Sequence, residues 1–111
     1  MIAVIFEGVP NDGKMEEYLS MAPKYKEHLE KLDGFISNER YQSCINPNKV
    51  LSLSFWRDEE SIRKFRELEV QMQDEKAGRE NLFKEYRICI TKIVRDYGLN
   101  DRKDAPQINQ V

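Results

Sequence analysis

The segment from residue 51 to residue 61 constrains the fold more than any other part of the chain. Leu51, Leu53 and Phe55 alternate with two serines and a tryptophan, and this two-residue period is typical of a β-strand. Asp58 follows where a helix N-cap belongs, and two glutamates come next, where the helix dipole favours negative charge. The segment therefore predicts a strand leading directly into a capped helix, and it sets the phase of the neighbouring elements.

Hydrophobic periodicity predicts the other elements of the chain. The expected strands span residues 2–9, 35–44, 50–56 and 86–97, and the expected helices span residues 14–32 and 61–69. Pro23 predicts a kink in the first helix, and Gly78 predicts a break or a second short helix after residue 69. This order is that of a ferredoxin-like βαββαβ fold of the α+β class. In that fold an antiparallel sheet carries both helices on one face.

The sheet face opposite the helices is expected to need a cover from outside the chain. The later strands carry apolar residues on both faces, and no third layer of elements is predicted. Packing of two sheets in a homodimer would supply that cover. We expect residues 1–98 to form the domain. Residues 99–111 are expected to form a C-terminal arm or tail that contacts the partner, since their few apolar groups have nothing local to pack on.

Composition narrows the classes of partner and compartment. The 18 basic and 20 acidic residues are mixed along 111 residues, which does not favour nucleic acid. No apolar run is long enough to span a membrane, and the first residues lack a basic signal-peptide region, so a cytoplasmic protein is expected. Cys44 and Cys89 lack the spacing of a metal motif and are expected to be free thiols; no bound metal is predicted.

Four segments give the chain a resemblance to a known family. They read IAVIFEGVPNDGK, LEKLDGFISNERYQS, NPNKVLSLSFWRDEESIRKF and VRDYGLNDR. In this order and spacing they resemble the antibiotic biosynthesis monooxygenase family of the dimeric α+β barrel superfamily. The resemblance implies a homodimer whose sheets form a barrel, with a pocket in each protomer between sheet and helices. Some members of that family oxidise aromatic substrates with dioxygen and without metal or flavin, and others degrade heme. Membership alone does not fix the reaction.

The heme-degrading branch is disfavoured by the residues present. That branch has an asparagine late in the first strand, a tryptophan on the second helix and an iron-binding histidine after it. The resemblance places Phe6, Phe65 and residues 71–72 at these positions, so none of the three is kept. His28 is off the apolar stripe of the first helix and lies among charged residues, which favours a solvated side chain over a catalytic base.

The candidate substrate-binding residues are mostly aromatic. They are Phe6, Trp56, Phe65, Gln71 and Tyr86. Trp56 points away from Leu53 and Phe55, so it is either a core or interface residue or a wall of an aromatic-binding pocket. Gln71 can hydrogen-bond a substrate but cannot transfer a proton near neutral pH. Four further residues could orient an acidic or phenolic substrate, although surface or ion-pair roles are favoured: Arg40, Tyr41, Arg57 and Arg66.

Two functions fit these observations. The first is a cofactor-independent monooxygenase acting on a small aromatic or quinone-type molecule, with catalytic residues that the sequence does not identify. No flavin or nucleotide motif is present, so no cofactor is expected. The alternative is a non-catalytic dimeric module that binds a small hydrophobic ligand or serves as an accessory protein. An enclosed cavity with converging polar groups would favour the enzyme, whereas a pocket filled by its own aromatic side chains would favour the module.

Overall fold

The structure of the protein, a computed structural model, describes residues 1–72 and 82–106, except for the side chains of Ala22 and residues 70–72. In this part of the chain the elements are β1 (Ile2–Pro10), α1 (Met15–Glu30), β2 (Phe35–Gln42), β3 (Val50–Trp56), α2 (Glu59–Met72) and β4 (Phe83–Lys92). The predicted βαββαβ order is confirmed. No described helix is long and apolar enough to cross a membrane.

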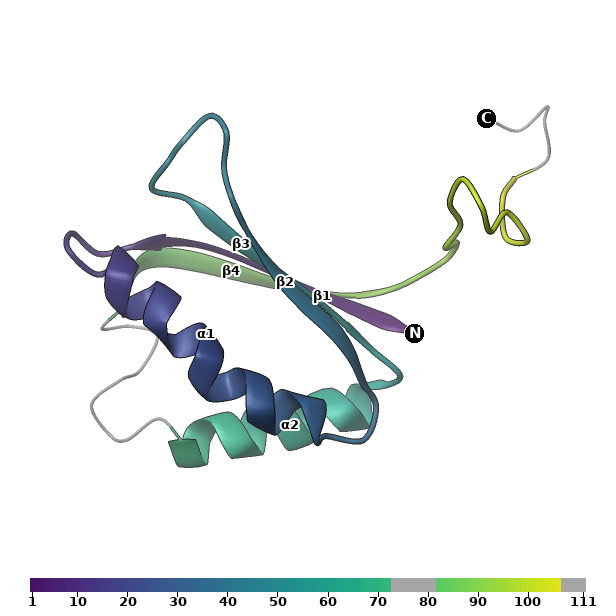
Figure 1. Cartoon of the computed structure of the whole chain (residues 1–111), viewed down its shortest axis with the longest axis horizontal. Helices are drawn as coiled ribbons and strands as arrows, with labels where there is room; N and C mark the ends of the chain where they lie inside the picture. The colour runs from purple at the N-terminus through teal and green to yellow at the C-terminus, as the bar shows by residue number, and fades with distance from the viewer. Residues whose placement is uncertain (73–81, 107–111) are drawn as a thin grey trace.

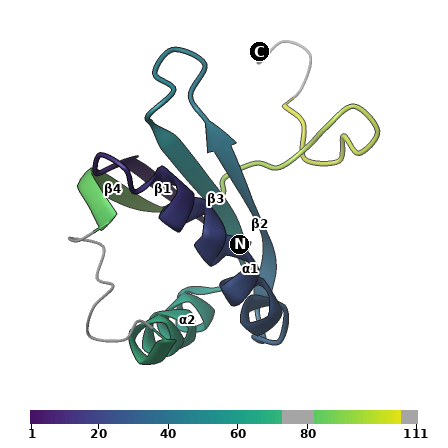
Figure 2. The same cartoon turned by 60° about the vertical axis from the view of Figure 1, so that its left-hand side comes forward.

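The four strands form one antiparallel sheet in the order β2-β3-β1-β4. Both helices lie against the same face of this sheet, as the two views show (Figures 1 and 2). The predicted α+β class and the predicted position of the helices are therefore confirmed. α1 continues through Pro23 as one helix. The predicted break near Gly78 falls outside the described residues.

The pairing register decides which side chains face the helices. Ile2 lies opposite Trp56 of β3, and Phe6 lies opposite Ser52. Trp56 packs in one buried cluster with Ile2 and with Leu29 of α1, so this set of alternate residues faces the helices. Trp56 is 2% exposed, which makes it the most buried large side chain of the core. The tryptophan therefore belongs to the helix-covered layer, and the sequence had left this open.

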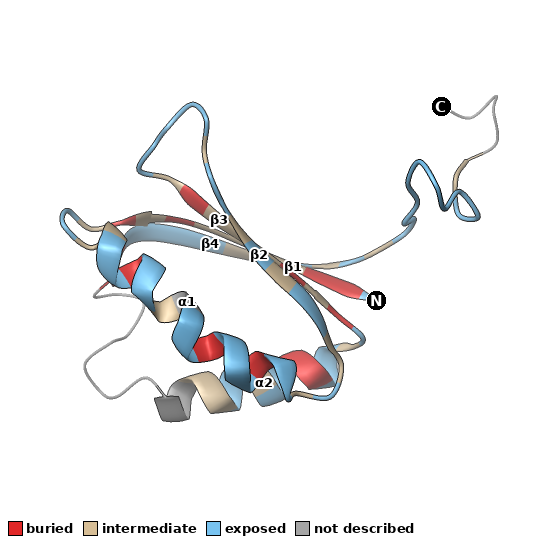
Figure 3. Cartoon of the chain, in the orientation of Figure 1, coloured by how far each residue is buried: buried red, intermediate tan, exposed pale blue. Residues whose placement is uncertain are grey.

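Two clusters of buried side chains fill the space between sheet and helices. The first consists of Ile2, Tyr25, Leu29, Trp56 and Ile62. The second consists of Tyr18, Val50, Leu82 and Phe83. The buried positions of α1 lie along one side of the helix, while its other side is exposed (Figure 3). Burial of these apolar groups is the main force that holds both helices on the sheet.

The opposite face of the sheet carries the other alternate residues. Leu51, Leu53 and Phe55 of β3 lie here, beside Ala3 and Ile5 of β1. The three β3 side chains and Ile5 are only partly buried, and neither α1 nor α2 covers them (Figures 1 and 2). An apolar sheet face of this kind is normally packed against a second layer.

β4 begins and ends earlier than predicted: it spans Phe83–Lys92 instead of residues 86–97. β4 pairs only with β1, and β1 begins at Ile2. The last bond runs from the Ile93 N–H to the Met1 carbonyl at 3.2 Å, so beyond it no strand is available for pairing. The chain after residue 93 leaves the sheet and extends away from it (Figure 1).

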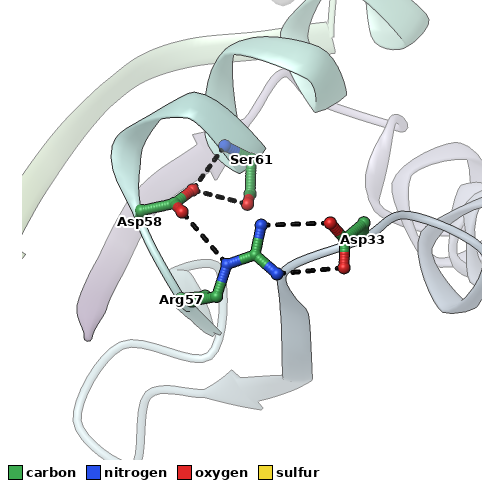
Figure 4. A network of polar contacts seen from close by, with 4 residues as sticks. All are labelled: Asp33, Arg57, Asp58 and Ser61. Carbon is green, nitrogen blue, oxygen red and sulfur yellow. Dashed lines mark hydrogen bonds and ion pairs between the residues drawn. The ribbon is translucent and has the colours of Figure 1, made fainter.

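The junction between β3 and α2 forms as predicted. The Asp58 carboxylate accepts hydrogen bonds from the backbone N–H of Ser61 at 2.9 Å and from its hydroxyl at 2.7 Å (Figure 4). This is N-cap geometry, and α2 begins at Glu59, as the Asp58 cap predicts, two residues before the start that hydrophobic periodicity gave. Arg57 donates to Asp58 at 3.0 Å and to both carboxylate oxygens of Asp33 at 3.0 and 3.1 Å. The network therefore ties the start of α2 to the turn before β2.

Gly34 lets the two turns approach each other this closely. Its φ is +93°, which is a left-handed conformation that favours glycine. A Cβ at this position would lie 1.8 Å from the Ser61 hydroxyl oxygen. The Gly34 carbonyl also accepts a hydrogen bond from the backbone N–H of Arg57 at 2.7 Å. The start of α2 is consequently fixed against the β2 strand, and α2 supplies one wall of the cavity described below.

Candidate functional site

A cavity of about 140 Å³ lies between the helix-covered face of the sheet and both helices. The half of the sheet formed by β1 and β4 gives it an apolar wall, made of Val4, Phe6, Ile88 and Ile90. Ligand pockets in proteins are usually apolar with a few well-placed polar groups. A dry apolar cavity of about 150 Å³ can admit benzene, so this one has room for a small ring.

The half of the sheet formed by β2 and β3 gives the cavity a polar wall. Asn38 and Arg40 lie on β2, opposite Ser54 and Ser52 of β3 respectively, and all four line the cavity. The Asn38 amide donates to the Ser52 hydroxyl oxygen at 2.9 Å, and the Trp56 indole N–H donates to the Ser54 hydroxyl oxygen at 2.8 Å. These hydrogen bonds satisfy the indole and fix the orientation of the Asn38 amide and the Trp56 ring.

Two buried polar atoms of the lining have no hydrogen-bond partner among the described residues. They are the Tyr18 hydroxyl oxygen and Nε of Arg40. The Arg40 guanidinium carbon lies 5.6 Å from the centre of the Tyr18 ring. Burial raises the pKa of the Tyr18 phenol above its usual value, and the nearby Arg40 guanidinium acts in the opposite direction without reaching hydrogen-bond geometry. Tyr18 is therefore a protonated hydrogen-bond donor at neutral pH.

The structure brings together three of the five predicted substrate-binding residues. Phe6, Trp56 and Phe65 all line the cavity. Trp56 lies 5.5 Å from Phe65 between ring centres; Trp56 belongs to the first core cluster, and the partly buried Phe65 packs against that cluster. Tyr86 is 41% exposed and stacks on Phe6 at 5.7 Å without being among the lining residues. Gln71 lies in the last turn of α2, and its side chain is outside the described structure.

Of the four polar residues considered as orienting groups, two line the cavity and two lie elsewhere. Arg40 and Arg66 line the cavity, with Arg66 exposed. Arg57 is the ion-pair partner of Asp33 and Asp58, as favoured from the sequence. Tyr41 is 46% exposed and donates a hydrogen bond to Glu39, its neighbour two residues earlier on β2.

The remaining candidate side chains lie outside the cavity lining. His28 is exposed in the last turn of α1, in agreement with a solvated side chain. Cys44 is exposed and Cys89 is partly buried, and both are free thiols as predicted. Within residues 1–72 and 82–106, no three histidine, cysteine, aspartate or glutamate side chains gather in a way that could hold a metal ion.

Sequence reasoning missed part of the polar wall. Asn38 drew no attention, and a surface or ion-pair role was favoured for Arg40, yet both face the cavity. The signal was present in the two-residue period. The hairpin pairs Arg40 with Ser52, and Ser52 shares a face with Trp56. Tyr18 was not among the predicted site residues, because the periodicity of a helix does not show how far the hydroxyl of a tyrosine reaches into a cavity.

Comparison with known proteins relates the whole chain to one family. The family described as antibiotic biosynthesis monooxygenase matches residues 1–72. A curated relative from Pyricularia oryzae, named jasmonate monooxygenase ABM, is 35% identical over 109 residues. The match covers 98% of this chain and 51% of the relative. The chain therefore spans about half the length of that fungal protein.

Solved structures share the fold at low sequence identity. Rv0793 from Mycobacterium tuberculosis has a TM-score of 0.72 at 14% identity, over 87% of this chain and 98% of that protein. A mutant of SnoaB, a cofactor-independent oxygenase from Streptomyces nogalater, has a TM-score of 0.65 at 11% identity, over 86% of this chain and 94% of that one. At such identities the likeness concerns the fold alone.

Proposed function

The chain belongs to the antibiotic biosynthesis monooxygenase family, and from this membership we propose that it oxidises a small aromatic or quinone-type molecule with dioxygen and without a bound cofactor. The observation that carries the proposal is the cavity, which combines an apolar aromatic interior with one polar wall. Both features lie on the helix-covered face of a single chain. A site of this kind can hold an electron-rich ring away from water.

The proposed reaction needs little chemistry from the protein. With 1-naphthol as an example, loss of the hydroxyl proton gives an electron-rich anion whose ring carbon bonds to dioxygen. The resulting hydroperoxide loses water, so a ring C–H becomes C=O and 1,4-naphthoquinone forms. One oxygen atom of dioxygen enters the product and the other leaves as water. The protein contributes orientation, exclusion of water and stabilisation of negative charge on the substrate oxygen.

Residues of the cavity are available for these contributions. Val4, Phe6 and Ile90 offer an apolar surface for the ring, beside the polar wall on the same face of the sheet. Glu69 of α2 is the one carboxylate among the described lining residues, and we assign it the role of proton acceptor for the substrate hydroxyl. The cavity volume favours one-ring or two-ring substrates over three-ring ones.

A non-catalytic ligand-binding module is the second candidate. One observation favours it, since the aromatic walls of the cavity are also core side chains. Phe6 packs edge-to-face on Phe83 at 5.0 Å, and Trp56 packs on Phe35 at 5.2 Å and on Phe65. Such a pocket could bind a hydrophobic ligand and leave it unchanged. Binding without consumption of dioxygen would identify this function.

We also propose that the protein is a homodimer in which the uncovered sheet faces pack together and residues 99–111 act as an arm on the partner. The partly buried Leu51, Leu53 and Phe55 support the sheet contact, because burial of apolar area drives association. Exposed apolar side chains near the arm support its contact, since Val94 is 87% exposed and Leu99 is 88% exposed. Residues 1–98 remain the proposed domain.

Dioxygen uptake tests the enzymatic proposal. The panel comprises quinols, naphthols and hydroxylated anthrones, with jasmonate included because of the fungal relative's name. We expect uptake of one dioxygen per naphthol, with no oxygen returned on adding catalase, because monooxygenation yields water. Autoxidation to hydrogen peroxide would return oxygen. Dioxygen uptake should be lost when a larger side chain occupies the cavity.

Two variants provide the matched comparison. Ile90→Phe enlarges a cavity-lining residue that is 45% exposed on an edge strand, so it narrows the cavity at small cost to folding. Ile45→Phe makes the same change in the β2–β3 connection, where Ile45 is 96% exposed. We expect Ile90→Phe to lose uptake and Ile45→Phe to keep it. Wild-type uptake no greater than that of Ile90→Phe, for every compound, would contradict the enzyme and favour the binding module.

A further inference from the structure

The two unpartnered polar atoms of the cavity carry an inference about how the substrate binds. Tyr18 is 6% exposed, and its hydroxyl oxygen is fully shielded from solvent, as is Nε of Arg40. Buried polar atoms without a partner are rare in proteins, and leaving one unsatisfied costs about 1–3 kcal/mol. Here two of them occur in the lining of one cavity, from facing elements α1 and β2.

Both atoms are hydrogen-bond donors. An arginine Nε–H can only donate, and the buried phenol of Tyr18 keeps its proton at neutral pH. Arg40 forms no salt bridge within the described part of the chain, and Glu69 is the one carboxylate among the described residues of the same cavity lining, so Arg40 keeps a permanent positive charge that a ligand can pair with. Two donors and one positive charge match a single oxygen atom that carries negative charge.

The rest of the cavity defines what that oxygen is attached to. Asn38 and the two serines of the polar wall are already engaged with each other and with Trp56. The neighbouring half of the sheet, including Val4, Ile88 and Ile90, is apolar. Among the described lining residues, Tyr18 and Arg40 are therefore the ones with a buried polar atom that lacks any hydrogen-bond partner, and Val4, Ile88 and Ile90 offer an apolar surface to the rest of a ligand.

We propose that Tyr18 and Arg40 form an oxyanion-binding position, so that the substrate is bound as the ionised form of a one-ring or two-ring phenol or enol. This deepens the proposed function and rests on it, because ionisation is the step that makes the ring reactive toward dioxygen. Tyr18 and Arg40 hold the negative oxygen on the polar side, and the ring lies toward β1 and β4. Preference for the anion over the neutral form is the expected signature.

The ionisation of bound 4-nitrophenol measures this preference. Its anion is yellow and the phenol titrates near neutral pH, so absorbance against pH gives the pKa of the bound probe directly. We expect wild-type protein to lower that pKa by about one unit or more relative to free probe, which equals a tenfold tighter hold on the anion. An unchanged or raised pKa, or no binding of the probe, would overturn the proposal.

Variants test whether the pKa shift of the probe is due to Tyr18 and Arg40 or to positive charge elsewhere on the protein. Arg40→Met should abolish the lowering and raise the probe's pKa above the free value, because an apolar cavity favours the neutral phenol. Tyr18→Phe should reduce the lowering without abolishing it. Arg87→Met is the matched control. Arg87 lies on the other face of the same sheet, paired with Glu7 at 3.2 Å, and its removal should leave the shift unchanged.

The outcomes distinguish this inference from the enzymatic proposal. Persistence of the full shift in Arg40→Met would overturn the oxyanion position, even if dioxygen uptake with naphthol remains. If the pKa shift of the probe is lost in Arg40→Met and reduced in Tyr18→Phe, but no compound causes dioxygen uptake, the oxyanion-binding position is supported and the proposed oxidation is contradicted. If Arg40→Met does not fold by circular dichroism, the wild-type shift and the Tyr18→Phe variant still decide, because equal shifts in those two proteins would remove Tyr18 from the site.

Discussion

The two faces of the sheet are built from the same strands, yet they meet different surroundings. On β3, Trp56 and Val50 face the helices and are 2% and 4% exposed. Leu51, Leu53 and Phe55 alternate with them, face the other way and remain partly exposed. One face is covered within the chain, while the other has an apolar surface that no described helix covers (Figures 1 and 2).

This difference shows how a small domain can hold both a core and a pocket. On β3 the covered face has the buried Val50 and Trp56 at its two ends and Ser52 and Ser54 between them, next to Asn38 and Arg40 of β2. The resulting cavity reduces the apolar area buried within one chain. A domain of this length buries only about two-thirds of its unfolded surface, so added burial on the uncovered face would offset that loss. The pocket and the proposed dimer are therefore connected, because apolar burial at the dimer contact replaces burial that the pocket removes.

Truncation of the two aromatic neighbours on β3 should give the largest contrast. Trp56→Ala removes the most buried large side chain and should lower the free energy of unfolding by about 3–5 kcal/mol at any protein concentration. Phe55→Ala, on the uncovered face, should cost less, and its effect should depend on protein concentration. Urea denaturation at two concentrations measures both. Equal, concentration-independent losses would erase the distinction between the faces.

A charge on the uncovered face should change assembly and leave the cavity intact. Leu53→Asp should convert a dimer to a monomer at micromolar concentration, because an unpaired carboxylate would be buried at the contact. Light scattering coupled to size exclusion gives the mass, with Ile45→Asp in the exposed connection as the unchanged control. A monomeric wild-type protein, or a dimeric Leu53→Asp, would contradict the proposed contact.

A hydroxyl on the covered face should matter more than one on the uncovered face. Ser54→Ala leaves the buried Trp56 indole N–H without its acceptor and should cost about 1–3 kcal/mol. Ser37→Ala, at an exposed position of β2, should change stability by less than about 0.5 kcal/mol. Denaturant midpoints compare the two directly. A Ser54→Ala protein as stable as Ser37→Ala would show that the indole finds another partner.

The smallest expected effect is the loss of stability in acid, which reports on the hydrogen bonds that Asp58 makes at the start of α2. Hydrogen bonds from Ser61 and Arg57 lower the pKa of Asp58 from 3.8 to about 2. Because the folded pKa is lowered, this carboxylate stabilises the fold above pH 3.8, and its contribution is lost as the pH falls toward 2. Asp58→Asn keeps a capping oxygen but cannot titrate. Melting temperatures of the two proteins should therefore converge over this range, and a constant difference would contradict the assignment.

Much of the covered face could be predicted from the sequence. The two-residue alternation placed Trp56 on the sheet face opposite to Leu53 and Phe55, and Asp58 marked the start of a helix. Both features were predictable because they depend on local geometry. Which set the helices would cover was not predictable, since a two-residue period is symmetrical between faces. The end of β4 was missed because it depends on where β1 begins, at Ile2.

The candidate site was predicted less completely than the fold. Phe6, Trp56 and Phe65 were identified as aromatic candidates, and they meet in the cavity. The convergence of Tyr18 and Arg40 was not predicted, because it joins a helix and a strand whose separation is set by core packing. Sequence periodicity gives the face on which a residue lies but not the depth that its polar atom reaches.

The most direct test asks whether a ligand enters the cavity on the covered face. Trp56 is the single tryptophan, so its indole N–H gives one unambiguous nuclear magnetic resonance signal. Titration with 4-nitrophenol should shift this signal saturably in wild type and in Leu53→Asp, and should not shift it in Ile90→Phe. No shift in wild type, or the same shift in Ile90→Phe, would contradict a ligand site between the sheet and the helices.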